Sequence, residues 1–265
     1  MKRLSFIAAG VIALAAAAPA AAADLPARTY TKAPVMVAPV YDWSGFYIGV
    51  NGGGGTSHKC WDLTTAVLVG RVVVPPGPEG CHDATGATVG GQIGYRWQSA
   101  AWVFGLEAQG NWADLKSSNV SLFIPAWTNN SKVEAFGLFT GQVGYAWNNI
   151  LWYVKGGAAV TGDKYRGTVT ATGVLFDSTS ETRWGGAVGT GLEFGFAPNW
   201  SVAVEYDHLF MGNHSPSFTS TGVLGAAVIP VGGVFRTDSI RQDVDLITAR
   251  INYRFNWGGP VVGKY

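Results

Sequence analysis

The chain has 265 residues, of which 48% are hydrophobic and only 13% are charged, and its net charge is +1. Charged residues make up about a quarter of an ordinary soluble domain, so this composition disfavours a soluble enzyme, and the near-neutral balance gives no sign of nucleic-acid binding. Beyond the N-terminal region, no apolar run reaches the roughly 20 residues that a membrane-spanning helix requires. Abundant glycine and tryptophan (37 and 11 residues) with few charges favour a transmembrane β-barrel.

The first 23 residues have the pattern of a secretory signal peptide. Lys2 and Arg3 precede an apolar, alanine-rich run over residues 4–18, and alanines at 21–23 offer a cleavage site before Asp24. An uncleaved membrane anchor is the alternative, but the run is short and ends in small residues, which favours removal of residues 1–23. Residues 24–42 contain three prolines and no periodicity. We therefore expect an extended periplasmic leader there, followed by a barrel domain at 43–265 with a short C-terminal extension.

From residue 43 onward, apolar and polar residues alternate with a period of two, which predicts strands with two unlike faces. Eight strands are expected, at about residues 43–54, 85–97, 101–113, 132–147, 151–165, 181–196, 200–208 and 240–255. Long loops are expected between them at about residues 54–84, 114–131, 166–180 and 209–239. The remaining connections are short polar turns.

A hairpin motif recurs along the chain at intervals of about 50 residues. GQIGYRWQSAAW begins at Gly91, GQVGYAWNNILW at Gly141 and the looser GTGLEFGFAPNW at Gly189. Repeats of this length also occur in propellers, but each unit here has one short turn and one long loop, whereas a propeller blade needs four strands. Short turns alternating with long loops are typical of an outer-membrane barrel, and eight strands close the sheet without a free edge.

Aromatic residues gather beside the short turns. They are Tyr95, Trp97, Trp102, Tyr145, Trp147, Trp152, Phe194, Phe196, Trp200, Tyr253 and Phe255. Such a belt is expected where a barrel crosses the headgroup region of a membrane, whereas a soluble β-sandwich would have to expose most of these rings or cover them all. The sequence thus predicts an all-β fold, an eight-stranded antiparallel up-and-down transmembrane β-barrel with short periplasmic turns and long extracellular loops.

Charged residues fall on the inward-facing parity of several strands, and their distance from the nearest short turn assigns them to layers of the lumen. The central layer holds Glu107, Lys155, Glu205 and Arg250; a layer nearer the periplasm holds Arg96, Glu193 and Arg254; a third, near the outer mouth, holds Glu134 and Arg183. An eight-stranded barrel has an interior just wide enough for side chains to fill. Opposite charges there should pair, because an unpaired buried charge is costly.

Both cysteines, Cys60 and Cys81, lie in the first expected loop. Export to an oxidising compartment favours a disulfide between them, and the alternative is a zinc site completed by His58 and His82. No Ser/His/Asp or paired-carboxylate arrangement points to catalysis, and the glycine-rich stretch 185–191 precedes no helix, as a dinucleotide-binding loop would require. We therefore expect no enzyme activity, no cofactor and no bound metal.

Several of these features together resemble one known family. They are the signal-like N-terminus, the proline-rich leader, WSGFYIGVNGG at residue 43, the repeated GQxGYxW hairpins and the terminal ARINYRFNWGGPVVGKY. The chain resembles the small outer-membrane β-barrel proteins of α-proteobacteria, often labelled porin-family or outer-membrane immunogenic proteins, which have an OmpA-like fold. The resemblance implies a surface antigen in the Gram-negative outer membrane that contributes to envelope structure and integrity. Two alternatives stay open: a narrow porin passing ions or small solutes, and a surface ligand-binding or adhesin protein.

The resemblance also bears on individual residues and partners. In OmpA-like barrels a charged plug fills the lumen and exchange of ion-pair partners is thought to gate a narrow path. The central charges here are therefore either a static plug, which we favour, or a gate. Phe255 is expected to be the terminal aromatic that the barrel-assembly machinery reads, with Tyr265 as the alternative. The other expected partners are outer-membrane lipid and lipopolysaccharide, with no nucleic acid, and an extracellular ligand is left open.

Overall fold

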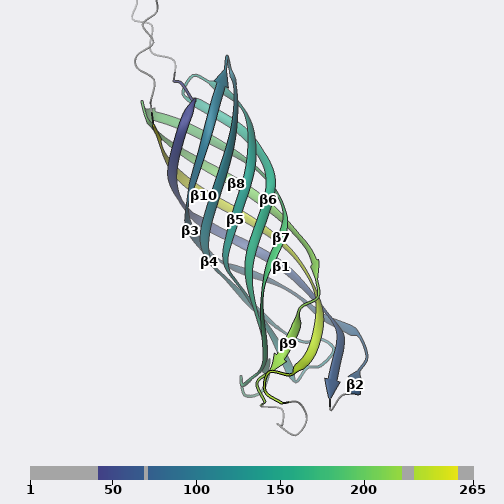
Figure 1. Cartoon of the computed structure of the whole chain (residues 1–265). Helices are drawn as coiled ribbons and strands as arrows, with labels where there is room; N and C mark the ends of the chain where they lie inside the picture. Colours follow the sequence, from purple (N-terminus) through teal and green to yellow (C-terminus); the bar gives the residue numbers. More distant parts are fainter. Residues whose placement is uncertain (1–40, 69–70, 223–229, 256–265) are drawn as a thin grey trace, which may run out of the picture. The chain divides into compact units, whose positions relative to one another are not determined.

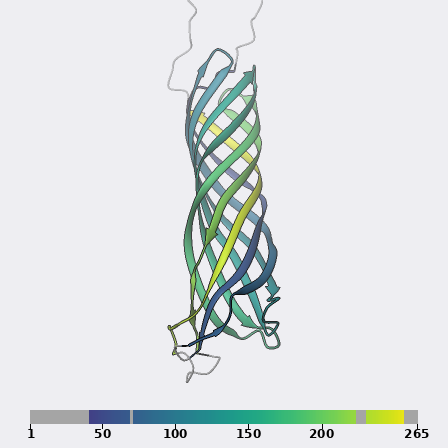
Figure 2. The ribbon, with the colours of Figure 1, turned by 90° about the vertical axis from the view of Figure 1, so that its right-hand side faces the viewer.

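Eight long strands form a closed antiparallel ring, which confirms the predicted barrel (Figures 1 and 2). The computed structural model describes residues 41–68, 71–222 and 230–255. The expected signal peptide, most of the leader and the C-terminal extension lie outside these ranges. The long strands are β1 (Gly45–Leu68), β3 (Gly77–Ser99), β4 (Trp102–Val120), β5 (Trp127–Trp147), β6 (Ile150–Val169), β7 (Leu175–Ala197), β8 (Trp200–His214) and β10 (Val234–Phe255).

The ring closes between its first and last strands. β1 pairs with β10 from Phe46 opposite Phe255 to Ala66 opposite Arg236, so neither strand keeps a free edge along this seam. Two short strands, β2 (Arg71–Val74) and β9 (Ser217–Ser220), pair beside the long ones at the end opposite the short turns (Figure 1). The described residues contain no helix long and apolar enough to span a membrane.

The outward-facing side chains form an apolar band with aromatic edges. On β4 the outward-facing residues of this band run from Trp102, beside the short turn, to Trp112. These two side chains are 52% and 76% exposed. Along β7 the band runs from Phe196 to Trp184, both also exposed. Ten residues of a tilted strand rise about 25 Å, which matches the apolar band of outer-membrane barrels. The exposed band is therefore the lipid-facing wall.

The strands extend far beyond this band. Most of the residue ranges that the sequence assigned to long loops are therefore wrong, because strands occupy much of them. β1 and β3 pair as far as Leu63 opposite Gly77, through the whole middle of the first expected loop. The other three expected loops are shortened in the same way, because β4 to β8 and β10 continue into them. The sequence-based prediction failed because the residue types change beyond the band. Outward residues there are polar and inward residues are partly polar and partly apolar, so the simple apolar–polar alternation disappears.

Candidate functional site in the barrel lumen

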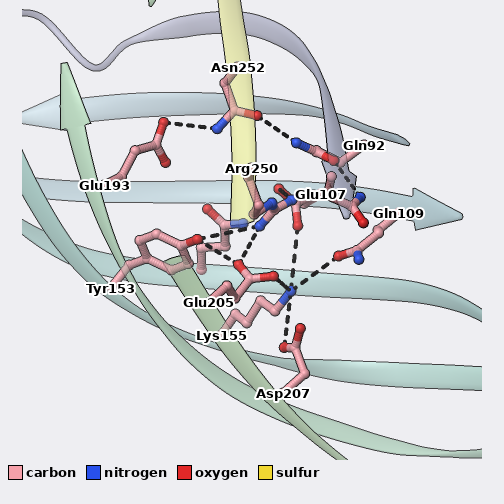
Figure 3. A network of polar contacts seen from close by, with 12 residues as sticks. Gln92, Glu107, Gln109, Tyr153, Lys155, Glu193, Glu205, Asp207, Arg250 and Asn252 are labelled. Carbon is pink, nitrogen blue, oxygen red and sulfur yellow. Dashed lines mark hydrogen bonds and ion pairs between the residues drawn. The ribbon is translucent and has the colours of Figure 1, made fainter. Parts of the chain in front are cut away.

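Four charged side chains from four strands meet in the middle of the barrel (Figure 3). Arg250 on β10 donates from Nη2 to Glu107 Oε2 on β4 at 2.6 Å, and its Nη1 donates to the Glu205 carboxylate on β8. The Lys155 Nζ of β6 lies 2.6 Å from Glu205 Oε1 and 3.6 Å from Glu107 Oε1. All four side chains are buried. The structure thus brings together the four residues that the sequence assigned to the central layer.

A third carboxylate, which sequence reasoning missed, joins this layer. Asp207, two residues beyond Glu205 on β8, has Oδ1 3.1 Å from Lys155 Nζ. The Gln109 amide oxygen accepts a further hydrogen bond from the same ammonium group at 3.5 Å (Figure 3). Three carboxylates therefore face the two cations, Lys155 and Arg250. Asp207 could have been identified from the sequence, because every second residue of β8 faces inward and Asp207 is two residues from Glu205.

Tyr47 positions Glu107 through a row across three strands. Tyr47 on β1 is the register partner of Gly94 on β3, which is in turn the partner of Glu107 on β4. The Tyr47 hydroxyl donates to Glu107 Oε2 at 2.7 Å. A Cβ on Gly94 would stand only 2.5 Å from that hydroxyl. Glycine at this position therefore lets the tyrosine ring reach over β3.

The same row occurs a second time around Glu205. Tyr153 on β6 pairs with Gly191 on β7, and Gly191 pairs with Glu205 on β8. The Tyr153 hydroxyl donates to Glu205 Oε2 at 2.5 Å (Figure 3), and a Cβ on Gly191 would again lie 2.5 Å from the hydroxyl. Arg250 contacts both glutamates. Two equivalent Tyr–Gly–Glu rows thus hold one arginine between them.

Only two of the three residues predicted for the periplasmic layer pair with each other. Arg96 Nη1 lies 2.9 Å from Glu193 Oε2. Arg254 instead donates to the Pro198 carbonyl at 2.8 Å, and its guanidinium lies over the Tyr41 ring. Arg254 is therefore directed towards the short turns at the mouth of the barrel rather than into the central charges.

The segment before β1 closes the periplasmic mouth. Trp43 is buried, and its Nε1 donates to the Asn148 carbonyl at 3.3 Å while its backbone N–H donates to Gln98 Oε1 at 2.9 Å. Between the Tyr41 and Trp43 rings and the Arg96 layer lies a cavity of about 10 Å³, which is room for about one water molecule. The mouth is therefore filled by side chains.

An apolar layer lies directly beyond the central charges, on the side away from the short turns. On β8 the inward residue after Asp207 is Leu209, and on β10 Leu246 lies four residues beyond Arg250 in that direction. The layer consists of Ala84, Ala113, Leu115, Val133, Phe136, Leu138, Ala159, Ala187, Leu209, Met211, Val244 and Leu246. These residues come from β3 to β8 and β10, so the layer extends across the lumen. Sequence reasoning missed it because many of its members fall within or beside the expected loops.

Further ion pairs fill the lumen beyond the apolar layer. Lys59 Nζ lies 2.7 Å from Asp163 Oδ1, and both side chains are fully buried. Arg183, predicted for the outer mouth, is buried at this level; it lies 3.1 Å from Glu181 and donates to Gln242 Oε1 at 2.9 Å. The inward position of Arg183 agrees with the sequence, but its partners differ from the expected one.

A last cluster, near the outer end, surrounds Arg236. Its guanidinium lies 2.7 Å from Asp177, 3.0 Å from Glu79 and 3.1 Å from Asp238. Burial raises the pKa of Asp238 to about 8, with Glu79 and Asp177 adding to the effect, although Arg236 opposes it. The physical cause is that one arginine cannot neutralise three buried carboxylates.

Glu134, the other residue predicted for the outer mouth, lies on the outer wall instead. Its carboxylate pairs with Lys132 at 3.1 Å and with Lys164 at 2.7 Å. The register of β5 against β6 shifts between Val133 and Ala135, so a β-bulge exchanges the two faces of the strand at this point. The simple parity count therefore assigned Glu134 to the wrong side.

Cys60 and Cys81 form a disulfide between β1 and β3, where they are register partners. The zinc alternative is contradicted by the orientation of the two histidines. His58 lies on the outer wall, hydrogen-bonded to Asp83, whereas His82 faces the lumen and contacts Asn119 and Ser131. Within the described residues, the potential ligands that cluster are His58 and the two sulfurs, which are already bonded to each other.

A closed ring with an apolar outer band and a lumen filled by charged and apolar side chains defines a transmembrane β-barrel of the outer membrane. Residues 6–255 match the family model described as the outer membrane protein beta-barrel domain. The chain therefore belongs to this family, and it is an outer-membrane barrel protein.

Relatives of known name are outer-membrane immunogenic proteins, as the resemblance implied. The 25 kDa outer-membrane immunogenic protein of Brucella abortus is 26% identical over 223 residues, covering 84% of this chain and 91% of that protein. The 31 kDa outer-membrane immunogenic protein of Brucella melitensis is 30% identical over 204 residues, covering 70% and 77%. A role at the envelope surface is consistent with this family.

Solved structures that match this chain include an outer membrane protein and a surface protein. OprG of Pseudomonas aeruginosa matches with 11% identity and a TM-score of 0.45, covering 82% of this chain and all of that one. Neisserial surface protein A matches with 13% identity and a TM-score of 0.35, covering 80% and 98%.

Proposed function

We propose that this protein is a closed, non-conducting and non-enzymatic barrel that contributes to the structure of the outer-membrane surface. The observation that carries the proposal is the arrangement of two unlike layers in series across the lumen. The central charges are buried and contact one another, and the apolar layer lies next to them. Because these charges are buried and engaged with each other, they offer a substrate no accessible reactive group.

The apolar layer favours the static plug over the gate. Exchange of partners among Glu107, Lys155 and Glu205 would open a path only through the charged layer. An ion would then meet Leu115, Leu209 and neighbouring side chains, where it would lose hydration without gaining a partner. A hydrophobic constriction of this kind stops conduction by excluding water.

Liposome swelling tests this proposal against the narrow porin. Purified, refolded protein is reconstituted into vesicles, and the vesicles are diluted into isotonic arabinose or potassium chloride. We expect vesicles with this protein to swell no faster than protein-free vesicles, while an open porin in a parallel sample gives rapid swelling. Swelling by this protein that increases with the amount reconstituted would contradict the closed barrel.

Two expectations about export and assembly belong to the same proposal. Residues 1–23 are removed on export, which N-terminal sequencing of the mature protein would test by finding Asp24 first. Phe255 serves as the assembly signal. In its support, Phe255 ends β10 and its ring lies 5.9 Å from that of Phe46 at the seam where the barrel closes. Phe255→Ala should reduce the folded, heat-modifiable fraction in outer membranes, whereas Tyr265→Ala should not.

A second candidate, surface ligand binding, is favoured by exposed apolar side chains at the outer end. Leu122 is 75% exposed and Val231 is 73% exposed, so apolar side chains at this end of the barrel are accessible to a partner. Deletion of residues 122–126, compared with the intact protein in whole-cell binding assays, tests this role. Equal binding by both strains would remove this candidate.

A further inference from the structure

Three lysines stand side by side on the outer wall of the barrel, just beyond the lipid-facing band. Lys116 on β4 is the register partner of Lys132 on β5, and Lys132 is the partner of Lys164 on β6. The three side chains are 59%, 34% and 46% exposed. Like charges directly opposite each other destabilise a sheet, so this lysine row is costly unless something negative compensates it.

The protein itself supplies only part of that compensation. Asp114 lies 2.8 Å from Lys116 and 3.3 Å from Lys132, and Glu134 bridges Lys132 and Lys164 at 3.1 and 2.7 Å. Arg166, two residues beyond Lys164 on the same outward parity, adds a fourth cation. Four cations and two carboxylates leave this side of the barrel with a net positive charge.

The lysine row lies at the height of the outer headgroups. Lys116 is four residues beyond Trp112, and Lys164 is four residues beyond Val160, the register partner of Trp184. Four residues of a strand tilted by about 40° rise about 10 Å, while the polar zone outside the hydrocarbon core is about 5 to 8 Å thick. The lysine backbones thus lie a few ångströms above the headgroup zone, and the lysine side chains can bend towards the membrane to reach it.

A groove runs beside this row and could hold a headgroup. It has a volume of about 340 Å³, and all four cations line it together with serine and asparagine residues of β4 and β5. Other parts of the outer wall have the opposite sign, since β3 and β10 present Asp83, Asp243 and Asp245 outward. The positive charge is thus concentrated on one wall.

We propose that this wall of β4, β5 and β6 binds the phosphate groups of an anionic glycolipid of the outer leaflet. Lysine ammonium groups bind phosphate as point charges with several donors. A phosphate placed over Lys132 would compensate the like-charge row, and the acyl chains of the same molecule would lie against the apolar band below. The site is independent of whether the lumen conducts.

Binding of defined lipids to the purified, refolded protein tests this site by native mass spectrometry. The probes are lipid A with two phosphates, the same lipid after removal of both phosphates, and inorganic pyrophosphate. We expect the bisphosphorylated lipid to bind most tightly, and Lys132→Gln/Lys164→Gln to weaken it by about tenfold or more. As a matched pair, Lys164→Gln should weaken binding, whereas Arg241→Gln, which removes one exposed cation from β10, should not.

A variant that removes negative charge distinguishes a phosphate-binding site from a set of ion pairs that only neutralise one another. Asp114→Asn/Glu134→Gln removes the carboxylates that compete with phosphate, so it should strengthen binding of bisphosphorylated lipid A. Heat-modifiable migration on gels checks that each variant is folded. The proposal is overturned if the lysine variant binds like the wild type, if the phosphate-free lipid binds equally well, or if pyrophosphate binds as tightly as the lipid.

Discussion

The Lys155 ammonium group lies 2.6 Å from the Glu205 carboxylate although β7 stands between their strands in the ring. The β7 residues paired with these two are Gly189 and Gly191, so no side chain separates them. The contact depends on these glycines as much as on the charges. The recurring glycines of the hairpin motif therefore help to build the interior of the barrel.

Gly191→Ala should destabilise the barrel by about 1–3 kcal/mol, because the added methyl group would overlap the Tyr153 ring and force it off Glu205. The measurement is urea-induced unfolding in lipid vesicles followed by tryptophan fluorescence. Gly110→Ala is the control, since a Cβ there would meet nothing within 4 Å. Equal stability of the two variants would show that the tyrosine does not need the space over Gly191.

The Cys60–Cys81 disulfide should make the mature protein lighter by two hydrogens than its reduced form, which intact-mass measurement resolves. Loss of the bridge in Cys60→Ser/Cys81→Ser should cost about 3 kcal/mol, because the bridge restricts the unfolded chain. Reduced wild-type protein should unfold like the double variant. Alkylation of either cysteine in the folded, unreduced protein would contradict the bridge.

Asp238→Asn should change how stability depends on pH at the outer end. The pKa of Asp238 is raised to about 8 in the folded protein, so this carboxyl favours folding at acid pH and that contribution is lost as pH rises from about 4 to about 8. Relative to the variant, the wild type should therefore lose unfolding free energy across this window, by at most about 1.4 kcal/mol per pH unit. Urea unfolding of both proteins at pH 5 and pH 8 measures it, and parallel pH profiles would contradict it.

Within the lipid-facing band, the sequence was sufficient to predict most of the fold. A residue there faces either lipid or a packed lumen, so parity alone placed Glu107, Lys155, Glu205 and Arg250 together. The count from the short turns worked because the register of these strands is regular over that distance. Glu134 shows the limit, since one β-bulge reversed its face and no sequence signal marked the bulge.

Beyond the band, the same reasoning failed for a physical reason. The outer wall there faces lipid headgroups and water, so polar residues such as Lys164 replace apolar ones, while the interior alternates between charged and apolar residues such as Lys59 and Trp61. Neither face is uniformly polar or apolar, so the sequence of these long strands resembles that of loops. The Arg236 cluster could have been found only by counting every second residue of β10 from Arg250 towards the outer end.

Single-channel recording of variants that open one layer or both tests the closed barrel most directly. We expect planar bilayers with the wild type, with Lys155→Ala, or with Leu209→Ser/Leu246→Ser to show no conductance steps, because one sealing layer remains in each. The triple variant that combines these changes should show discrete steps. Steps from the wild type would contradict the closed barrel, and steps from Lys155→Ala alone would show that the central charges by themselves block the lumen, as a gate would.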